Sequence, residues 1–273
     1  MTKKLYKYIA PFVIVGLLFL VLPKTAEAAI AFDAASNANN INITSLTWSH
    51  TTTGTNLLLV VGTFAKDGTD ADRPVSDVTY GGVSLTKVRE DDDTTINHTS
   101  GLWYLVNPAT GANDVVVSFA GGTLQVGIAG AMTFTGVKQT SPLDASNGGV
   151  QANAASISTT VTTVSDNAMV AASVNKVGSS PTSNDAGAGI TERWDVDVTE
   201  ASGNVSSGGH AGPKSPAGDQ AMSWSQSVGT THDWAISAAS FAPASEGAAA
   251  TEPSSLVIQK GAVFIEKGQM VIQ

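Results

Sequence analysis

Two acidic segments are the first places where residue types and spacing could support chemistry. The segment KDGTDAD carries three aspartates, and REDDD carries four successive acidic residues soon after a Gly-Gly pair. Calcium takes about six to eight oxygen ligands, carboxylates among them, so acidic loops are a means of holding it in a β protein. The spacing is not that of an EF-hand loop, which leaves two interpretations, a structural calcium site or solvated acidic loops. The candidate calcium ligands are Asp67, Asp70, Asp72, Glu90, Asp91, Asp92 and Asp93. We expect no other cofactor.

Two tryptophans are candidates for holding a carbohydrate. Trp194 and Trp224 lie in the polar segments TERWDVD and MSWSQS, and an indole at a surface can stack on the face of a sugar ring. The alternative is that these rings belong to the core, as large aromatic residues usually do in β-sandwiches. Trp103 and Trp234 lie inside apolar segments, so we expect both of them to be buried.

The signatures of common hydrolytic sites are not found in this sequence. A glycosidase needs two carboxyl groups beside the scissile bond, and on one strand they must share a face. In ERWDVD, Glu192 and Asp195 are three positions apart and are expected on opposite faces, so only Asp195 and Asp197 share one. No G-x-S-x-G motif occurs, and the four histidines show no i, i+4 pair for zinc. These histidines are His50, His98, His210 and His232. We therefore expect a protein that is not an enzyme.

The elements that would position these residues are short strands. NLLLVVGTFA is a continuous apolar run typical of a strand buried on both faces. DVTYGGVSLTKVRE predicts two strands joined by a two-residue turn at Gly81–Gly82. Helical periodicity is not evident after the first 28 residues, and many short strands with turns between them indicate a sandwich or a barrel. We predict an all-β fold, a two-sheet antiparallel sandwich of jelly-roll type, over residues 29–243.

Four segments carry a resemblance to a known class of modules. They are SLTWSHTTTGTNLLLVV, VTYGGVSLT, LWYLVNPATGANDVVVSF and HDWAISAASFAPA. In its alternation of strands and turns the chain resembles secreted bacterial and phage-associated jelly-roll modules of the concanavalin A-like type. The resemblance implies this architecture and an extracellular role in adhesion, glycan binding or surface structure. It carries no binding residue over to this sequence, and a fold alone does not fix a function.

The first 28 residues predict secretion. Three lysines precede the apolar stretch PFVIVGLLFLVL, and AEA supplies a small-x-small cleavage site. The apolar stretch is shorter than the roughly 20 residues of a membrane-spanning helix, so we expect a signal peptide over 1–28 and no stable membrane span after cleavage. Cleavage removes four lysines and one glutamate, which changes the formal net charge from −9 to −12. Such a charge opposes binding to nucleic acid, and the absence of cysteine means that the fold must rest on its core.

The end of the chain predicts a separate β-motif. Residues 244–255 read as a flexible linker, and residues 256–273 read as three short strands joined at Lys260–Gly261 and Lys267–Gly268. With two-residue turns, Ile265 would pair with Met270 and Val263 with Ile272. One face of this three-stranded meander would then be wholly apolar. That predicted assembly face consists of Leu256, Ile258, Val263, Ile265, Met270 and Ile272.

Three functions remain at this point. We expect a secreted or cell-surface structural or adhesive protein, in which the C-terminal meander binds an identical copy or another surface protein. Three short strands are marginally stable unless their apolar face is covered, and an exposed apolar patch indicates interaction. The alternative is a lectin-like glycan-binding module, with or without calcium. A polysaccharide-acting enzyme is the third.

Overall fold

A computed structural model describes residues 29–67, 75–178, 183–198, 203–226 and 231–245, together with the backbone of two strands near the C-terminus. Every regular element in this part of the chain is a β-strand, and all the pairings are antiparallel. The strands from β1 to β17 lie in one compact unit, Ala28–Ala244. Residues 1–28 and 246–255, which contain the predicted signal peptide and most of the predicted linker, lie outside the described residues.

The first half of the compact unit forms two sheets that pack as a sandwich. Its strands are β1 (Ala31–Ile43), β2 (Ser45–Thr52), β3 (Leu58–Lys66), β4 (Val75–Tyr80), β5 (Val83–Ser84), β6 (Thr86–Asp93), β7 (His98–Val106), β8 (Gly111–Phe119) and β9 (Leu124–Thr135). One sheet has the order β1-β9-β3-β7-β6, and the other has the order β2-β8-β4-β5. The apolar run of β3 is buried and central, as its sequence predicts.

The second half repeats this arrangement. Its strands are β10 (Leu143–Ala154), β11 (Ser156–Thr162), β12 (Ala168–Val177), β13 (Asp185–Ala186), β14 (Thr191–Val198), β15 (Asn204–Lys214), β16 (Asp219–Ser225) and β17 (His232–Phe241). The sheets have the orders β10-β17-β12-β15-β14 and β11-β16-β13. Each strand of the second half, taken in chain order, occupies the place of its counterpart in the first, except that β5 has none among the described strands. The compact unit Ala28–Ala244 is therefore built from two tandem copies of one sandwich.

The repeat extends to single residues. Residues 33–66 align without a gap with residues 144–177, an offset of 111 positions. Asn42 and Asn153 both have φ of 52°, while Asn56 and Asn167 have φ of 51° and 59°. Asparagine is among the few residues that adopt this left-handed backbone at low cost. The same residue type therefore makes the same turn in both copies.

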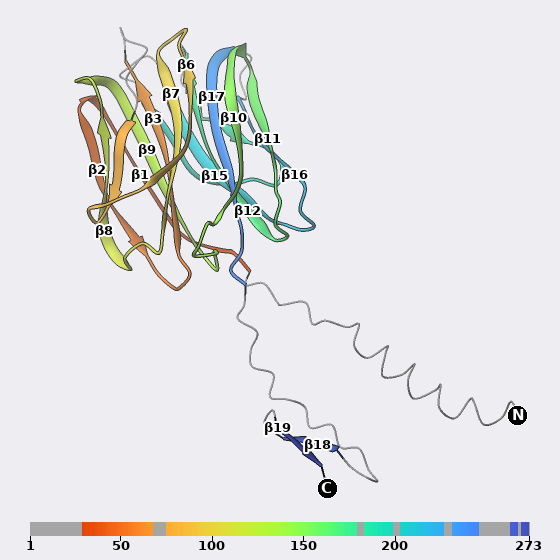
Figure 1. Cartoon of the computed structure of the whole chain (residues 1–273). Helices are drawn as coiled ribbons and strands as arrows, with labels where there is room; N and C mark the ends of the chain where they lie inside the picture. The colour runs from red at the N-terminus through yellow and green to blue at the C-terminus, as the bar shows by residue number, and fades with distance from the viewer. Residues whose placement is uncertain are drawn as a thin grey trace, which may run out of the picture. The chain divides into compact units, whose positions relative to one another are not determined.

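The two sandwiches pack against each other through their five-stranded sheets. Gly62 of β3 lies so close to Ser173 of β12 that a Cβ added at Gly62 would be 2.6 Å from the serine side chain. Ser173 is the counterpart of Gly62 at the 111-residue offset, so equivalent positions meet at the interface. Figure 1 shows the resulting layers, from β2 and β8 on one side, through the two five-stranded sheets, to β11 and β16 on the other.

These observations confirm an all-β fold of antiparallel sheets in sandwich packing. The layers number four in the described part of the chain, two more than the sequence predicted, because one predicted domain contains two sandwiches. The Gly81–Gly82 turn is confirmed, since Tyr80 pairs with Val83 and both glycines have positive φ. The jelly-roll assignment stays a prediction.

Each space between sheets has its own apolar core. Within the first sandwich, residues such as Leu59, Val78 and Trp103 pack together. The second sandwich packs Ile157, Met222 and Trp234 in the same way. A third cluster, which includes Leu58, Met132 and Met169, fills the space between the sandwiches. Burial of these side chains supplies the main stabilisation of a chain without disulfides.

The C-terminal strands β18 (Val263–Glu266) and β19 (Gln269–Ile272) form a two-stranded antiparallel sheet. Ile265 pairs with Met270 and Val263 with Ile272, which confirms the predicted register around Lys267–Gly268. The first strand of the predicted meander, with Leu256 and Ile258, lies outside the described residues.

Candidate functional site

Both candidate glycan-binding tryptophans are buried. Trp194 is 3 % exposed and lies between the two sandwiches, where it packs on Gly62, Gly130 and Gly208. Trp224 is fully buried inside the second sandwich. Neither ring offers a face to a sugar in solution, which corrects the expectation drawn from their polar sequence neighbours. Polar sequence neighbours do not indicate that a residue of a strand is exposed, because alternate residues face opposite sides. An indole can therefore point inward between two solvated side chains.

The candidate calcium ligands do not form one loop site in the described residues. Asp70 and Asp72 lie outside these residues, and Asp67 is buried at the end of β3. The four acidic residues from Glu90 to Asp93 belong to strand β6, not to a loop. Strand alternation separates them, with Asp91 and Asp93 buried and Asp92 exposed. Within the described part of the chain, no three His, Asp or Glu side chains converge in a way that could hold a metal ion.

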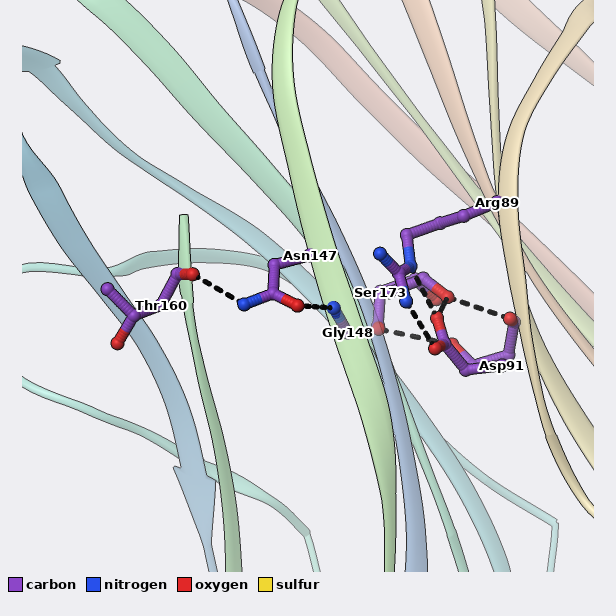
Figure 2. A network of polar contacts seen from close by, with 8 residues as sticks. Arg89, Asp91, Asn147, Gly148, Thr160 and Ser173 are labelled. Carbon is purple, nitrogen blue, oxygen red and sulfur yellow. Dashed lines mark hydrogen bonds and ion pairs between the residues drawn. The ribbon is translucent and has the colours of Figure 1, made fainter. Parts of the chain in front are cut away.

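Asp91 instead joins the two sandwiches. Its carboxylate accepts hydrogen bonds of 2.7 and 2.5 Å from the Arg89 guanidinium and one of 2.5 Å from Ser237 Oγ on β17. Ser237 Oγ also lies 2.8 Å from the Ser100 carbonyl oxygen. Figure 2 shows this network, in which Asp91 lies beside Arg89 and Ser100 Oγ donates to the Ser173 carbonyl oxygen. Arg89 on the same strand compensates the charge of the carboxylate through a bidentate contact, and the Ser237 hydrogen bond makes Asp91 a structural contact between β6 and β17.

Asn147 lies on the other side of the same region in Figure 2. Its side-chain nitrogen donates to the Thr160 carbonyl oxygen of β11 at 2.8 Å, and its side-chain oxygen accepts from the Gly148 amide at 2.9 Å. The residue therefore connects the edge strands β10 and β11 of the second sandwich and is part of its scaffold.

A β-bulge brings Glu192 and Asp195 to the same face of β14. The register of β14 on β15 shifts between Glu192 and Trp194, and a bulge of this kind inserts one extra residue into the strand. Glu192 contacts Trp224 inside the second sandwich, whereas Arg193 lies over the Phe32 ring and Trp194 packs on Gly130, both of the first sandwich. The expectation that Glu192 and Asp195 face opposite sides is therefore wrong, because plain alternation does not hold across the bulge.

Glu192 lies in an environment that favours its neutral form. Burial and the nearby charge of Asp195 raise the pKa of Glu192 to about 7, and Asp185 acts in the same direction. The Trp224 indole donates a 3.2 Å hydrogen bond to its carboxylate oxygen, which opposes this shift. Since desolvation disfavours the ionised form of a carboxyl group, this group exchanges its proton near neutral pH.

Asp195 is held by hydrogen bonds from two residues that also bond to each other. Ser207 Oγ donates to one carboxylate oxygen at 2.6 Å, and the Asn184 backbone amide donates to the other at 3.1 Å. The Asn184 side-chain nitrogen donates to Ser207 Oγ at 2.8 Å. These contacts fix the position of Asp195 between β14 and β15.

A lysine and a glutamine lie in contact in the interior of the same sandwich. Lys176 of β12 is fully buried, and its Nζ donates to Gln226 Oε1 at 3.0 Å. The same amine lies 5.4 Å from the centroid of the Trp234 ring. Burial lowers the pKa of Lys176, and the charges of Asp195, Asp197 and Asp185 oppose that shift. We call Lys176, Gln226, Glu192, Asp195 and Asp185 the second-sandwich polar cluster.

The first sandwich lacks the lysine–glutamine pair at the equivalent positions. The alignment and strand pairings place Ala65 where the second sandwich has Lys176, and Phe119 where it has Gln226. Ala65 and Phe119 both belong to the apolar core of the first sandwich. The two copies share one strand order, so apolar side chains can fill this part of a sandwich as well as polar ones. The Lys176–Gln226 contact is therefore a specific feature of the second copy, and the cluster around it is the best candidate site.

The buried histidines form no part of it. His50 hydrogen-bonds Ser36 Oγ at 2.8 Å and Thr133 Oγ1 at 2.6 Å. Burial is the main cause that lowers the pKa of His50, His98 and His210 to about 4. Near pH 7 these three rings are neutral. His50 and His210 make hydrogen bonds, whereas His98 packs beside the Phe64 ring.

Compared with protein-family models, curated proteins and solved structures, the chain matches none of them. In the part of the chain that the structure describes, no helix is long and apolar enough to cross a membrane.

The sequence of the chain did carry a signal for the duplicated fold, since FDAA and LDAS begin equivalent strands and TTTGTN and TTVSDN form equivalent turns. The polar cluster had no such signal, because its five residues come from three different strands and a loop.

Proposed function

We propose that the chain is a secreted structural or adhesive surface protein in which the C-terminal β-motif mediates attachment or assembly. The observation that carries this proposal is the register of the terminal hairpin. It pairs Val263 with Ile272 and Ile265 with Met270, and strand alternation assigns these four apolar residues to one face. An isolated two-stranded hairpin is marginally stable in water, so this motif gains stability when its apolar face is covered.

The composition of the sandwich surface supports assigning the contact to the tail. Among the described residues, the exposed large hydrophobic side chains are few, namely Val83, Leu143, Val150 and Val164. Protein–protein contacts are expected where apolar residues gather in one patch. The partner of the tail is then a second copy of the chain or another surface protein with a free sheet edge or apolar groove.

Truncation after Ser245 tests the proposal. Ala244 N donates to the Gly136 carbonyl oxygen at 2.8 Å, and Pro243 bridges to Val137, so a chain that ends at Ser245 keeps these contacts. We expect light scattering to find oligomers of the secreted full-length chain and monomers of the truncated one. Monomers in both samples, together with no retention of the full-length chain on the producing cells, would contradict the proposal.

Two matched substitutions separate the apolar face from the tail as a whole. Ile265→Asp places a charge on the predicted assembly face, whereas Val271→Asp places the same charge at a register position of the opposite face. We expect loss of assembly with Ile265→Asp and retention with Val271→Asp. Equal effects of the two changes would mean that the apolar face is not the contact.

A polysaccharide-acting enzyme is the second candidate, because the bulge in β14 puts Glu192 and Asp195 on one face and the pKa of Glu192 is raised to about 7. A protonated carboxyl group beside a second carboxyl group is the requirement for glycoside hydrolysis. Release of reducing ends from a panel of polysaccharides tests this role. Activity that disappears in Glu192→Gln would favour it over the structural proposal, and inactivity of the wild-type chain would remove it.

A further inference from the structure

The second sandwich holds a primary amine against a carboxamide between its two sheets. Lys176 belongs to β12, the central strand of one sheet, and Gln226 directly follows β16 of the other. Lys176 Nζ lies 3.0 Å from Gln226 Oε1, and the two residues are 0 % and 9 % exposed. This contact joins two sheets that otherwise hold together mainly by apolar packing.

The surroundings of Lys176 favour the form of the amine that reacts. A buried ammonium loses its hydration, and its pKa falls in consequence. A lysine desolvated in this way is an activated nucleophile, because the neutral amine carries a free electron pair. Trp234 covers the amine on one side, which restricts access of bulk water to the pair.

Carboxyl groups lie close enough to influence this amine electrostatically. Asp195, Asp197 and Asp185 all act on the charge of Lys176. Glu192, which shares a face with Asp195, gains and loses a proton near pH 7. Acyl transfer from an amide needs a group that takes a proton from the amine and a group that gives one to the leaving nitrogen. The aspartates that act on the charge of Lys176 are the candidates for this proton transfer.

We propose that Lys176 and Gln226 form an intramolecular amide cross-link between the two sheets of the second sandwich. The electron pair of Lys176 Nζ attacks Gln226 Cδ and forms an N–C bond. The bond between Cδ and Nε2 then breaks, and the leaving nitrogen departs as ammonia after it takes up the proton that Nζ loses. No oxidant or reductant is needed, because an amide and an amine become an amide and ammonia.

The first sandwich supports this inference as an internal comparison. Ala65 and Phe119 occupy the equivalent places, so the same backbone needs neither a lysine nor a glutamine there. Burial of a lysine costs free energy that an alanine does not. In a chain without cysteine, an amide between the sheets would remove that charge and supply a covalent cross-link. This inference is independent of the proposed assembly role of the tail.

Mass spectrometry of the secreted chain tests the proposal. Cross-linking lowers the intact mass by about 17 Da, the mass of the ammonia lost. Trypsin cannot cleave after an acylated Lys176, so the digest should contain a branched species that joins residues 139–193 to residues 215–260. Detection of that species in the wild-type chain confirms the cross-link without any variant.

Controls separate the cross-link from other losses of ammonia. Asn147 precedes Gly148, and an Asn-Gly sequence also loses ammonia when it forms a succinimide. The succinimide reopens in mild alkali, whereas the amide between Lys176 and Gln226 persists. Lys176→Arg and Gln226→Leu should each restore the full mass. The proposal is overturned if the folded wild-type chain keeps the full mass after prolonged incubation near pH 7. It is also overturned if the loss of mass persists in Lys176→Arg or the branched species is missing from the digest.

Discussion

Asp33 and Asp144 make the same kind of contact in the two sandwiches, 111 positions apart. Asp33 accepts hydrogen bonds from the Thr53 amide at 2.8 Å and from Thr53 Oγ1 at 2.5 Å. Asp144 accepts from the Val164 amide at 2.7 Å and from the Ser165 amide at 3.0 Å. In both copies a carboxylate on the first strand anchors the turn that follows the second strand. The two copies therefore share this turn-anchoring contact as well as the strand order.

Asp33→Ala and Asp144→Ala should both destabilise the chain, and Asp144→Ala should do so more, because Asp144 also accepts from Ser165 Oγ at 2.8 Å and from Ser240 Oγ at 3.1 Å. Each change removes an acceptor for at least one backbone amide of a turn, so we expect a loss of about 1 kcal/mol or more at each site. Because the two sites share no hydrogen-bond partner, the double substitution should lose close to the sum. Urea unfolding measures these values, and Asp33→Asn and Asp144→Asn, which keep one acceptor oxygen, should lose less. A large effect at only one site would mean that the two turns are not equivalent.

Trp194→Ala should be among the most destabilising single changes. The ring is 3 % exposed and fills the space that Gly130 and Gly208 leave open. Removal of a buried tryptophan ring leaves a cavity between the sandwiches, with an expected loss of about 3 to 5 kcal/mol. Trp48→Ala is the matched comparison, since Trp48 is only partly buried, and it should lose less. Equal losses in urea unfolding would contradict the placement of Trp194.

The fold class was predictable from the sequence because its segments carry the residue patterns of strands bounded by turns. The continuous apolar run of β3 and the Gly81–Gly82 turn identify a central strand and a hairpin. The duplication was harder to see, because its clearest identities are polar turn residues such as Asn42 and Asn153. Core positions differ between the two copies, as Ala65 and its counterpart Lys176 do. A comparison of the apolar patterns alone therefore does not reveal the repeat.

The candidate site could not be predicted, for a geometric reason. The faces of Glu192 and Asp195 depend on a bulge at Arg193, and a bulge of this type has no fixed sequence signature. Lys176 and Gln226 are 50 positions apart and meet only because β12 and β16 lie in facing sheets. The hydrophobicity of the segments around Trp194 and Trp224 is likewise low although both rings are buried.

Gly62→Ala should destabilise the contact between the sandwiches. An added Cβ would be 2.6 Å from the Ser173 side chain, which forces the two central strands apart or moves the serine. Overpacking of this kind costs about 1 to 3 kcal/mol. Ser173→Gly in the same chain should recover part of the loss, because the two positions face each other. A double-mutant cycle by urea unfolding checks this coupling, and additive effects would contradict the direct contact.

The buried histidines should make the chain less stable in acid. The pKa values of His50, His98 and His210 are about 4 in the folded chain, below the value of about 6.5 expected in the unfolded chain. The unfolded chain therefore binds more protons between these values, and the free energy of unfolding should fall as the pH drops from about 6.5 to 4, by up to about 1.4 kcal/mol per histidine and pH unit. Urea unfolding at a series of pH values measures the slope, and NMR of the imidazole C–H groups assigns it to each ring. Histidines that titrate near pH 6.5 in the folded chain would contradict this prediction.

Glu192 should act in the opposite direction over an overlapping range of pH. Its pKa is raised to about 7 in the folded chain from an ordinary value of 4.5, so the folded chain holds the extra proton. The free energy of unfolding should therefore decrease as the pH rises from about 4.5 to 7 on account of this group. Glu192→Gln removes this contribution and keeps an acceptor for the Trp224 indole N–H. The difference in unfolding free energy between Glu192→Gln and the wild-type chain should grow in favour of the variant between pH 5 and 7. A difference that does not change with pH would show that Glu192 is already ionised in the folded chain.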